Sequence, residues 1–90
     1  MGFLGLARRF SGDLLDISTT GILMTGPEDI ELGSVGRVGI PMGHETIRIA
    51  VTVRRILPGV GVALEFSQMT PHGRELLHRL LTYLAKPPSP

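Results

Sequence analysis

Residues 45–56 read ETIRIAVTVRRI, which is the clearest alternation of apolar and polar positions in the chain. From residue 47 to residue 53, isoleucine or valine occupies every second position, and polar or small side chains fill the positions between them. A period of two puts alternate side chains on opposite faces of a β-strand. The stretch therefore predicts a long strand with one face in the core. The side chains predicted to form that face are Ile47, Ile49, Val51 and Val53.

Turn residues flank this strand on both sides. Gly43-His44 predicts a hairpin from a strand over residues 34–42, and Pro58-Gly59 predicts a turn into GVGVALEF at 59–66. Proline presets one dihedral of such a turn, and glycine supplies the positive one that follows. The side chains predicted to point inward are Val38, Ile40 and Met42 in the preceding strand, and Val60, Val62, Leu64 and Phe66 in the following strand.

Two shorter strands are predicted earlier in the chain, DLLDIS at 13–18 and ILMT at 22–25, joined by a turn over residues 19–21. Gly26-Pro27 ends the second of them. Simple alternation divides the first strand into two faces, with Leu15 and Ile17 inward and Leu14, Asp16 and Ser18 outward.

One amphipathic helix is predicted to close the chain. Thr70 suits its N-cap and Pro71 its first position, and prolines at 87 and 88 end it. Short antiparallel strands followed by one helix predict a mainly β fold, a small barrel or curled sheet whose open end the helix covers. The apolar stripe of the helix is formed by Leu76, Leu77, Leu80, Leu81 and Leu84.

The length of 90 residues predicts a single domain. Residues 1–10 are interpreted as a leader or a partial first strand. Residues 11–85 form the sheet and the helix, and residues 86–90 form a disordered tail.

Composition excludes several classes of protein. A net charge of +1 and the absence of tryptophan argue against a nucleic-acid binder. There is no cysteine, and the three histidines lack the spacing of metal ligands, so no metal site is expected. No triad, carboxylate pair or phosphate loop is present, which predicts a protein without catalytic residues rather than an enzyme. No apolar run could span a bilayer and no secretion signal is present, so we expect a cytoplasmic protein.

The turn between the two short strands, DISTTG at 16–21, admits two interpretations. Asp16 and Ser18 would stand about 7 Å apart on the outer face, where a carboxylate suits the paired N–H groups of guanine and a hydroxyl suits phosphate. Gly21 would allow a backbone dihedral that other residues resist and would leave room for a ligand near the backbone, and Arg8 and Arg9 would offer guanidinium groups to phosphate or guanine. The other interpretation is ordinary turn chemistry, since these residue types commonly bond their own backbone.

Taken in order, these features resemble a PilZ domain, the bacterial module that binds cyclic di-GMP. The family motif D/N-x-S-x-x-G is matched by Asp16, Ser18 and Gly21, and the resemblance extends through IRIAVTVRR and ALEF to the helix, over residues 11–85. It implies a six-stranded antiparallel barrel with a C-terminal helix. It also implies a cyclic di-GMP ligand on the surface of this motif, wrapped by an R-x-x-x-R segment that precedes it.

The chain departs from the family pattern before the motif. Arg8 and Arg9 are adjacent rather than four apart, and six residues separate Arg9 from Asp16. The first strand is therefore expected to be short or displaced, with the R-x-x-x-R motif absent or degenerate. Loss of one arginine contact of this motif would weaken binding of the ligand by roughly ten- to a hundredfold. A missing sixth strand leaves an open edge, which residues 3–9 could fill in cis or from a second copy, and we predict a self-associating protein, a homo-oligomer.

These residues and their order support two functions. The first is a cyclic di-GMP receptor in bacterial signalling, with ligand-binding residues Arg8, Arg9, Asp16, Ser18 and Gly21. The alternative is a degenerate PilZ-like module that contacts an unknown downstream protein through the leucine stripe or an open edge. In either case the other arginines of the strands, at positions 37, 48 and 54, are interpreted as solvated surface charges, and Glu65 as a surface residue.

Overall fold

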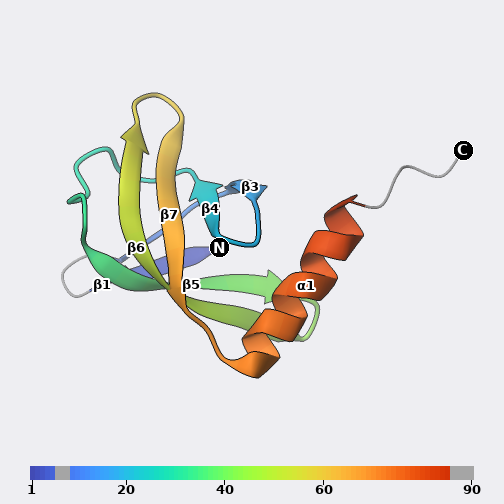
Figure 1. Ribbon diagram of the computed structural model, residues 1–90. Helices are drawn as coiled ribbons and strands as arrows, with labels where there is room; N and C mark the ends of the chain where they lie inside the picture. Colours follow the sequence, from blue (N-terminus) through green and yellow to red (C-terminus); the bar gives the residue numbers. More distant parts are fainter. Residues whose placement is uncertain (6–8, 86–90) are drawn as a thin grey trace, which may run out of the picture.

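The computed structural model describes residues 1–5 and 9–85 of the chain. Within these residues seven strands form one antiparallel sheet and a single helix follows them (Figure 1). The strands are β1 (Gly2–Gly5), β2 (Arg9–Ser11), β3 (Leu14–Ile17), β4 (Gly21–Met24), β5 (Val35–Met42), β6 (Glu45–Leu57) and β7 (Gly61–Gln68), and the helix is α1 (Pro71–Ala85).

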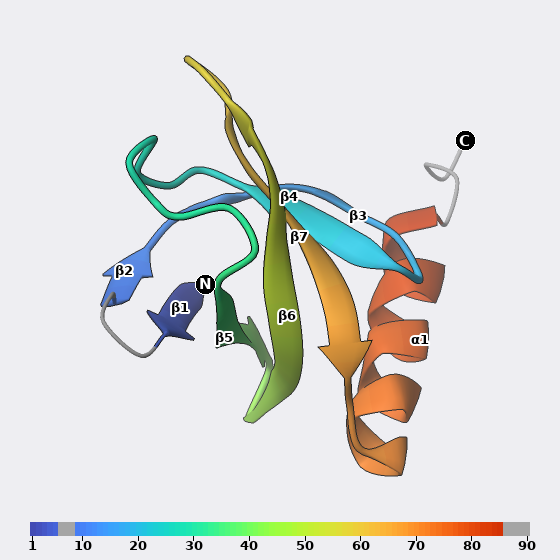
Figure 2. The same ribbon diagram turned by 60° about the vertical axis from the view of Figure 1, so that its left-hand side comes forward.

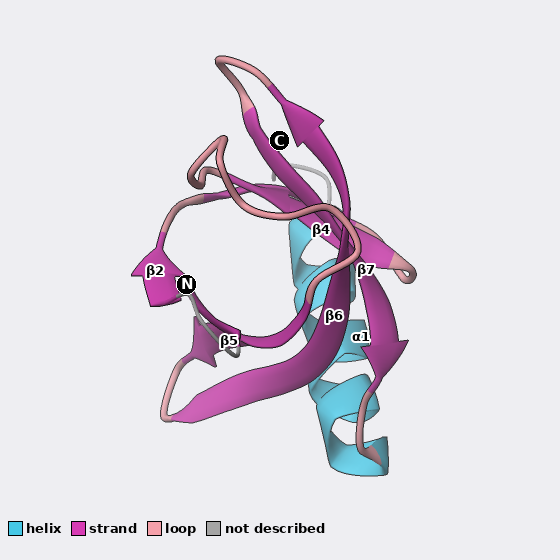
Figure 3. Ribbon diagram, turned by 90° about the vertical axis from the view of Figure 1, so that its left-hand side faces the viewer, coloured by secondary structure: helices cyan, strands magenta, loops and turns pink. Residues whose placement is uncertain are grey.

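The sheet is strongly curled but is not closed into a barrel. Its strand order is β2-β1-β5-β6-β7-β4-β3, so β2 and β3 are its two edges. Figures 2 and 3 show the sheet wrapping around its concave side. Only Gly12 and Asp13 connect the two edge strands along the chain. The predicted six-stranded barrel is therefore wrong in strand number and in closure, while the mainly β class and the single C-terminal helix are confirmed.

The N-terminal strands explain this difference. β1 pairs with β5, with Phe3 opposite Val38, and β2 pairs with the other side of β1. Phe3 is 2% exposed and its ring stacks on Phe10 at a centroid distance of 4.9 Å. Burial of these rings ties the N-terminal residues to the sheet. β1 and β2 thus extend the sheet in cis, while β2 and β3 remain as its edges, and the structure gives the predicted self-association no support.

The core lies on the concave face of the sheet, and β6 supplies its centre. The predicted inward face of β6 is confirmed, since Ile47, Ile49, Val51 and Val53 are each at most 1% exposed. The hairpin at Gly43 is confirmed as well, because Met42 pairs with Glu45 and Gly43 has a positive φ of 62°. Other core side chains include Phe3, Met24, Val38, Ile40, Val62 and Leu64.

Two predicted inward positions are wrong, for two separate reasons. The pairing of β3 with β4 shifts between Leu14 and Asp16, which makes Leu15 the extra residue of a β-bulge. Leu14 then packs against the core, and Leu15 is 46% exposed. Val60 is 53% exposed because it closes the turn, where its N–H donates to Leu57 O at 2.9 Å.

The helix α1 begins as predicted. The Thr70 hydroxyl accepts a hydrogen bond from Gly73 N at 2.9 Å, and Pro71 is the first helical residue. The leucine stripe covers the core only over its first part, because Leu76 and Leu77 are buried while Leu84 is 53% exposed. Figure 2 shows α1 lying alongside the sheet. Within the described part of the chain no helix has the length and apolarity needed to cross a membrane. The predicted tail at 86–90 lies outside the described residues.

Close approach of β7 to β4 requires a glycine at position 61. A Cβ there would meet the carbonyl oxygen of Met24, which is backbone and cannot move aside. We predict that Gly61→Ala lowers the free energy of unfolding by about 1–3 kcal/mol through overpacking. Gly39→Ala is the matched control, because its Cβ would meet only Thr46 Cγ2 at 3.4 Å. Urea denaturation of both variants checks the prediction, and equal losses would contradict it.

Candidate functional site

The turn between β3 and β4 is held by its own side chains. Ser18 N donates to Gly21 O at 2.9 Å. The Ser18 hydroxyl accepts hydrogen bonds from Thr20 N at 3.2 Å and Gly21 N at 3.3 Å. Thr20 O in turn accepts a hydrogen bond from Phe66 N at 2.8 Å, which fastens the turn to β7. The predicted turn chemistry is thus present, and Ser18 is fixed in place by it.

Asp16 stands at the exposed edge of this turn. Its Oδ1 accepts a hydrogen bond from Ile17 N at 2.9 Å, which orients the carboxylate. No ion pair of Asp16 is found within the described part of the chain. The carboxylate therefore keeps acceptor capacity that a ligand could use, because an ionised carboxylate has about four lone-pair sites.

The fold requires a glycine at position 21, but for a reason other than the predicted one. Its φ is not positive, since the positive-φ glycines of the described residues are Gly33, Gly43 and Gly59. A Cβ at position 21 would instead meet the carbonyl oxygen of Leu64 on β7. Gly21 is thus required for the close pairing of β4 with β7, a role that strand registry creates and the local sequence does not reveal.

A shallow cavity of about 290 Å³ opens on the outer face of the sheet beside the turn. The pairing of the strands determines which side chains form the floor of this cavity, because Asp16 pairs with Leu23 and Leu23 pairs with Ala63. These side chains lie on the face opposite the core, and the small Ala63 leaves a depression. The full lining is Asp16, Ile17, Ser18, Thr20, Gly21, Ile22, Leu23, Arg54, Ala63, Leu64 and Glu65.

The structure brings three of the five predicted ligand residues together. Asp16, Ser18 and Gly21 all line the outer-face cavity. Arg9 is exposed in β2, at the opposite edge of the sheet order from β3, and does not line the cavity. Arg8 lies outside the described residues.

Sequence reasoning missed Arg54, which was interpreted as a solvated charge. Arg54 lines the outer-face cavity and forms an ion pair with Glu65, with Nε to Oε2 at 2.8 Å. A weaker second contact joins its terminal nitrogen to Glu65 Oε1 at 3.4 Å. The sequence carried one signal, because the alternation of the strand already puts Arg54 on its outer face. Which side chains of other strands share that face depends on pairing between distant segments.

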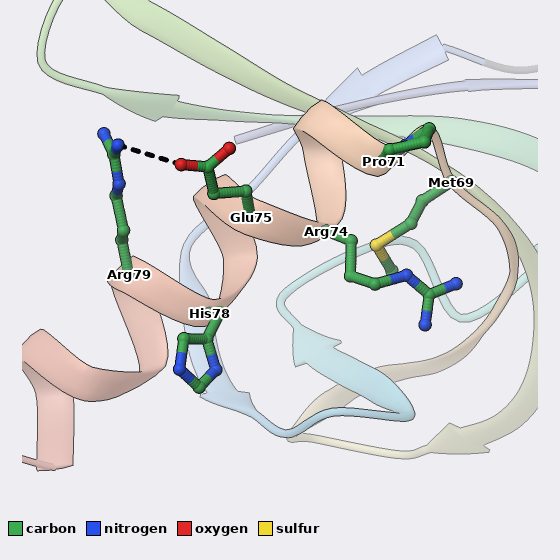
Figure 4. A pocket seen from close by; sticks show the side chains of 6 residues that line it. All are labelled: Met69, Pro71, Arg74, Glu75, His78 and Arg79. Atoms are coloured by element: carbon green, nitrogen blue, oxygen red, sulfur yellow. Dashed lines mark hydrogen bonds and ion pairs between the residues drawn. The ribbon is translucent and has the colours of Figure 1, made fainter.

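Polar surface continues from this cavity towards the helix. Thr20 and Glu65 also line a neighbouring cavity of about 480 Å³, which reaches Arg74 at the start of α1. Figure 4 shows Arg74 lying beside Met69, apart from the ion pair between Glu75 and Arg79 at 3.0 Å. Arginine side chains thus border the turn on two sides, from β6 and from α1.

Fold and site together define a small curled-sheet module with a shallow, partly polar cavity beside one turn. The chain belongs to the PilZ family, because the sequence model of the PilZ domain matches residues 4–83. No curated protein matches the chain. PilZ domains are binding modules rather than enzymes. The match begins in β1, so the N-terminal strands belong to the region that the family model covers.

Two substitutions distinguish the residue of the turn that the fold requires from the exposed residue that is available to a ligand. Gly21→Ala is expected to lower the free energy of unfolding by about 1–3 kcal/mol, because the new methyl group meets the Leu64 carbonyl. Asp16→Ala is expected to change it by less than about 0.5 kcal/mol, since the side chain is exposed. Chemical denaturation measures both values. A large loss for Asp16→Ala would show that the carboxylate serves the fold instead of a ligand.

Proposed function

We propose that this chain binds cyclic di-GMP in the outer-face cavity and acts as a receptor domain in bacterial second-messenger signalling. The observation that carries the proposal is the position of Asp16 and Ser18 at one cavity whose floor is apolar. Membership of the PilZ family supports it. Binding would act by changing the contacts of the domain with another protein, without chemistry on the ligand.

Asp16 is assigned to the guanine base. Its carboxylate can accept from the N1–H and the exocyclic amine of guanine as a pair, a pattern that adenine does not offer. Leu23 and Ala63 supply an apolar floor against which the flat face of the base can lie. Two chemically different contacts, one polar and one apolar, would then fix the same base.

Ser18 is assigned to an oxygen of the ligand. Its hydroxyl already accepts hydrogen bonds from two backbone N–H groups of the turn. Because a hydroxyl has two acceptor lone pairs and one hydrogen, the group left for a ligand is the donor. That hydrogen has only a long contact with Gly21 O at 3.4 Å or a contact with Thr20 Oγ1 at 3.1 Å. A phosphate oxygen or guanine O6 is the matching acceptor.

The contribution of Arg8 and Arg9 stays a prediction. Arg9 is not part of the cavity lining, so any direct contact with the ligand would be made from β2, outside this cavity. A double alanine variant at positions 8 and 9 would measure their share of the affinity.

An exposed apolar surface favours the second candidate function, a protein-interaction module. Tyr83 is 74% exposed and Leu84 53% exposed on the last turns of α1. A cavity of about 410 Å³ lies between this end of the helix and β3, where Leu15 is 46% exposed. Asp16 borders both this cavity and the outer-face cavity, so nucleotide and protein partner would meet at one residue.

Calorimetric titration with cyclic di-GMP tests the proposed function. The unaltered protein is expected to bind, and Asp16→Ala to weaken binding by roughly ten- to a hundredfold, the value of one charge-assisted contact. Asp13→Ala is the matched control, because Asp13 is an exposed carboxylate that does not line the cavity. Absence of heat with the unaltered protein would defeat the receptor proposal. Equal losses of affinity in Asp16→Ala and Asp13→Ala would contradict a direct contact between Asp16 and the ligand.

A partner captured equally well with and without cyclic di-GMP, and lost in Leu84→Ser, would support the interaction module instead. The helix is expected to survive this change because Leu84 is largely exposed. Arg79→Ser is the control on the polar face of the same helix. Equal capture by both variants would contradict an interface at this end of α1.

A further inference from the structure

Arg54 lies at an irregularity of the sheet. The pairing of β6 with β7 passes from Val53 opposite Leu64 to Arg55 opposite Ala63, so Arg54 is an extra residue in β6. An extra residue of this kind bends the strand and re-aims a side chain. Arg54 lines the outer-face cavity, and the adjacent Arg55 does not.

The same row of the sheet carries Asp16 on the other side of that cavity. Asp16 pairs with Leu23, and Leu23 pairs with Ala63, whose partner on β6 is Arg55, next to Arg54. Three strand spacings separate β3 from β6, which is about 14 Å. A carboxylate and a guanidinium therefore stand at opposite sides of one apolar floor.

The charges around this floor do not favour an anion unless Arg54 takes part. Asp16 and Glu65 are both acidic, and Arg54 is the one basic residue among the described lining residues. Cyclic di-GMP carries two negative phosphodiesters, which two unopposed carboxylates would repel. Arg54 is the group that can offset this repulsion at close range.

Glu65 holds Arg54 in a way that leaves it usable. The carboxylate takes Nε–H and one hydrogen of a terminal nitrogen, which leaves three of the five guanidinium N–H donors. The two side chains are 57% and 52% exposed, so solvent and ligand can reach them. An exposed pair of this kind contributes little to stability, and a phosphate can displace the carboxylate.

We propose that Arg54 is the phosphate-binding cation of this site and that Glu65 is its intramolecular competitor. In the free protein Glu65 neutralises Arg54 and orients its plane. In the complex a phosphodiester of the ligand takes the place of the Glu65 carboxylate, while Asp16 holds a guanine across the floor. This inference rests on the proposed function, and it assigns to β6 the positive charge that Arg9 does not bring to the cavity lining.

The test is a calorimetric titration with cyclic di-GMP of the full chain and of three variants. Arg54→Ala is expected to weaken binding by about tenfold or more. Arg55→Ala, the neighbouring exposed arginine outside the cavity, is expected to stay within about twofold of the unaltered protein. Glu65→Gln removes the competing charge and is expected to tighten binding by about two- to fivefold. If the ion pair were merely structural, Arg54→Ala and Glu65→Gln would both lower the affinity for cyclic di-GMP.

The outcomes separate this inference from the proposed function. Binding by the unaltered protein with no loss in Arg54→Ala would overturn the role of Arg54 and leave the receptor function standing. Weaker binding by Glu65→Gln would overturn the competition. No binding by either the unaltered protein or Glu65→Gln would overturn both. Binding seen only in Glu65→Gln would support the competition and would defeat the receptor function of the unaltered protein. Thermal unfolding of each variant, expected to be unchanged, shows that the fold is retained.

Discussion

The pairing of β6 with strands on both of its sides is the constraint on which the rest of the structure depends. Its inner face supplies the centre of the core, with Ile47 and Val51 fully buried. Its outer face carries arginines, and Arg54 lines the cavity together with Ala63 and Glu65 of the neighbouring strand β7. Because β7 also pairs with β4, the register of β6 is transmitted to the turn that holds Ser18. The core and the candidate site therefore lie on opposite faces of the same sheet, and one set of strand pairings positions both.

Local signals predicted the elements that local chemistry decides. Alternation identified β6, the glycine at 43 identified its hairpin, and Thr70 with Pro71 identified the start of α1. Each of these depends on residues adjacent in the chain. The same is true of Asp16 and Ser18, whose spacing within one short motif brought them to a common cavity.

What the sequence did not predict depends on pairing between distant strands. The bulge at Leu15 exists only relative to β4, so simple alternation assigned the wrong face to Leu15. Alternation put Arg54 on the outer face but could not show that Arg54 shares a cavity with the turn between β3 and β4. The strands β1 and β2 are too short to show a period, and they join the sheet because Phe3 packs into a core that other strands build. The close contact that requires Gly21 is likewise made by β7.

The central claim is that the outer face of the sheet beside the Asp16–Gly21 turn receives a cyclic dinucleotide. Backbone amide shifts, recorded by NMR while cyclic di-GMP is added, test it most directly because they locate the ligand residue by residue. We predict the largest shifts at Ser18, Leu23, Ala63 and Glu65, with small ones on α1 beyond Leu80. Saturable shifts confined to β1 and β2, or to the exposed end of the helix, would contradict it.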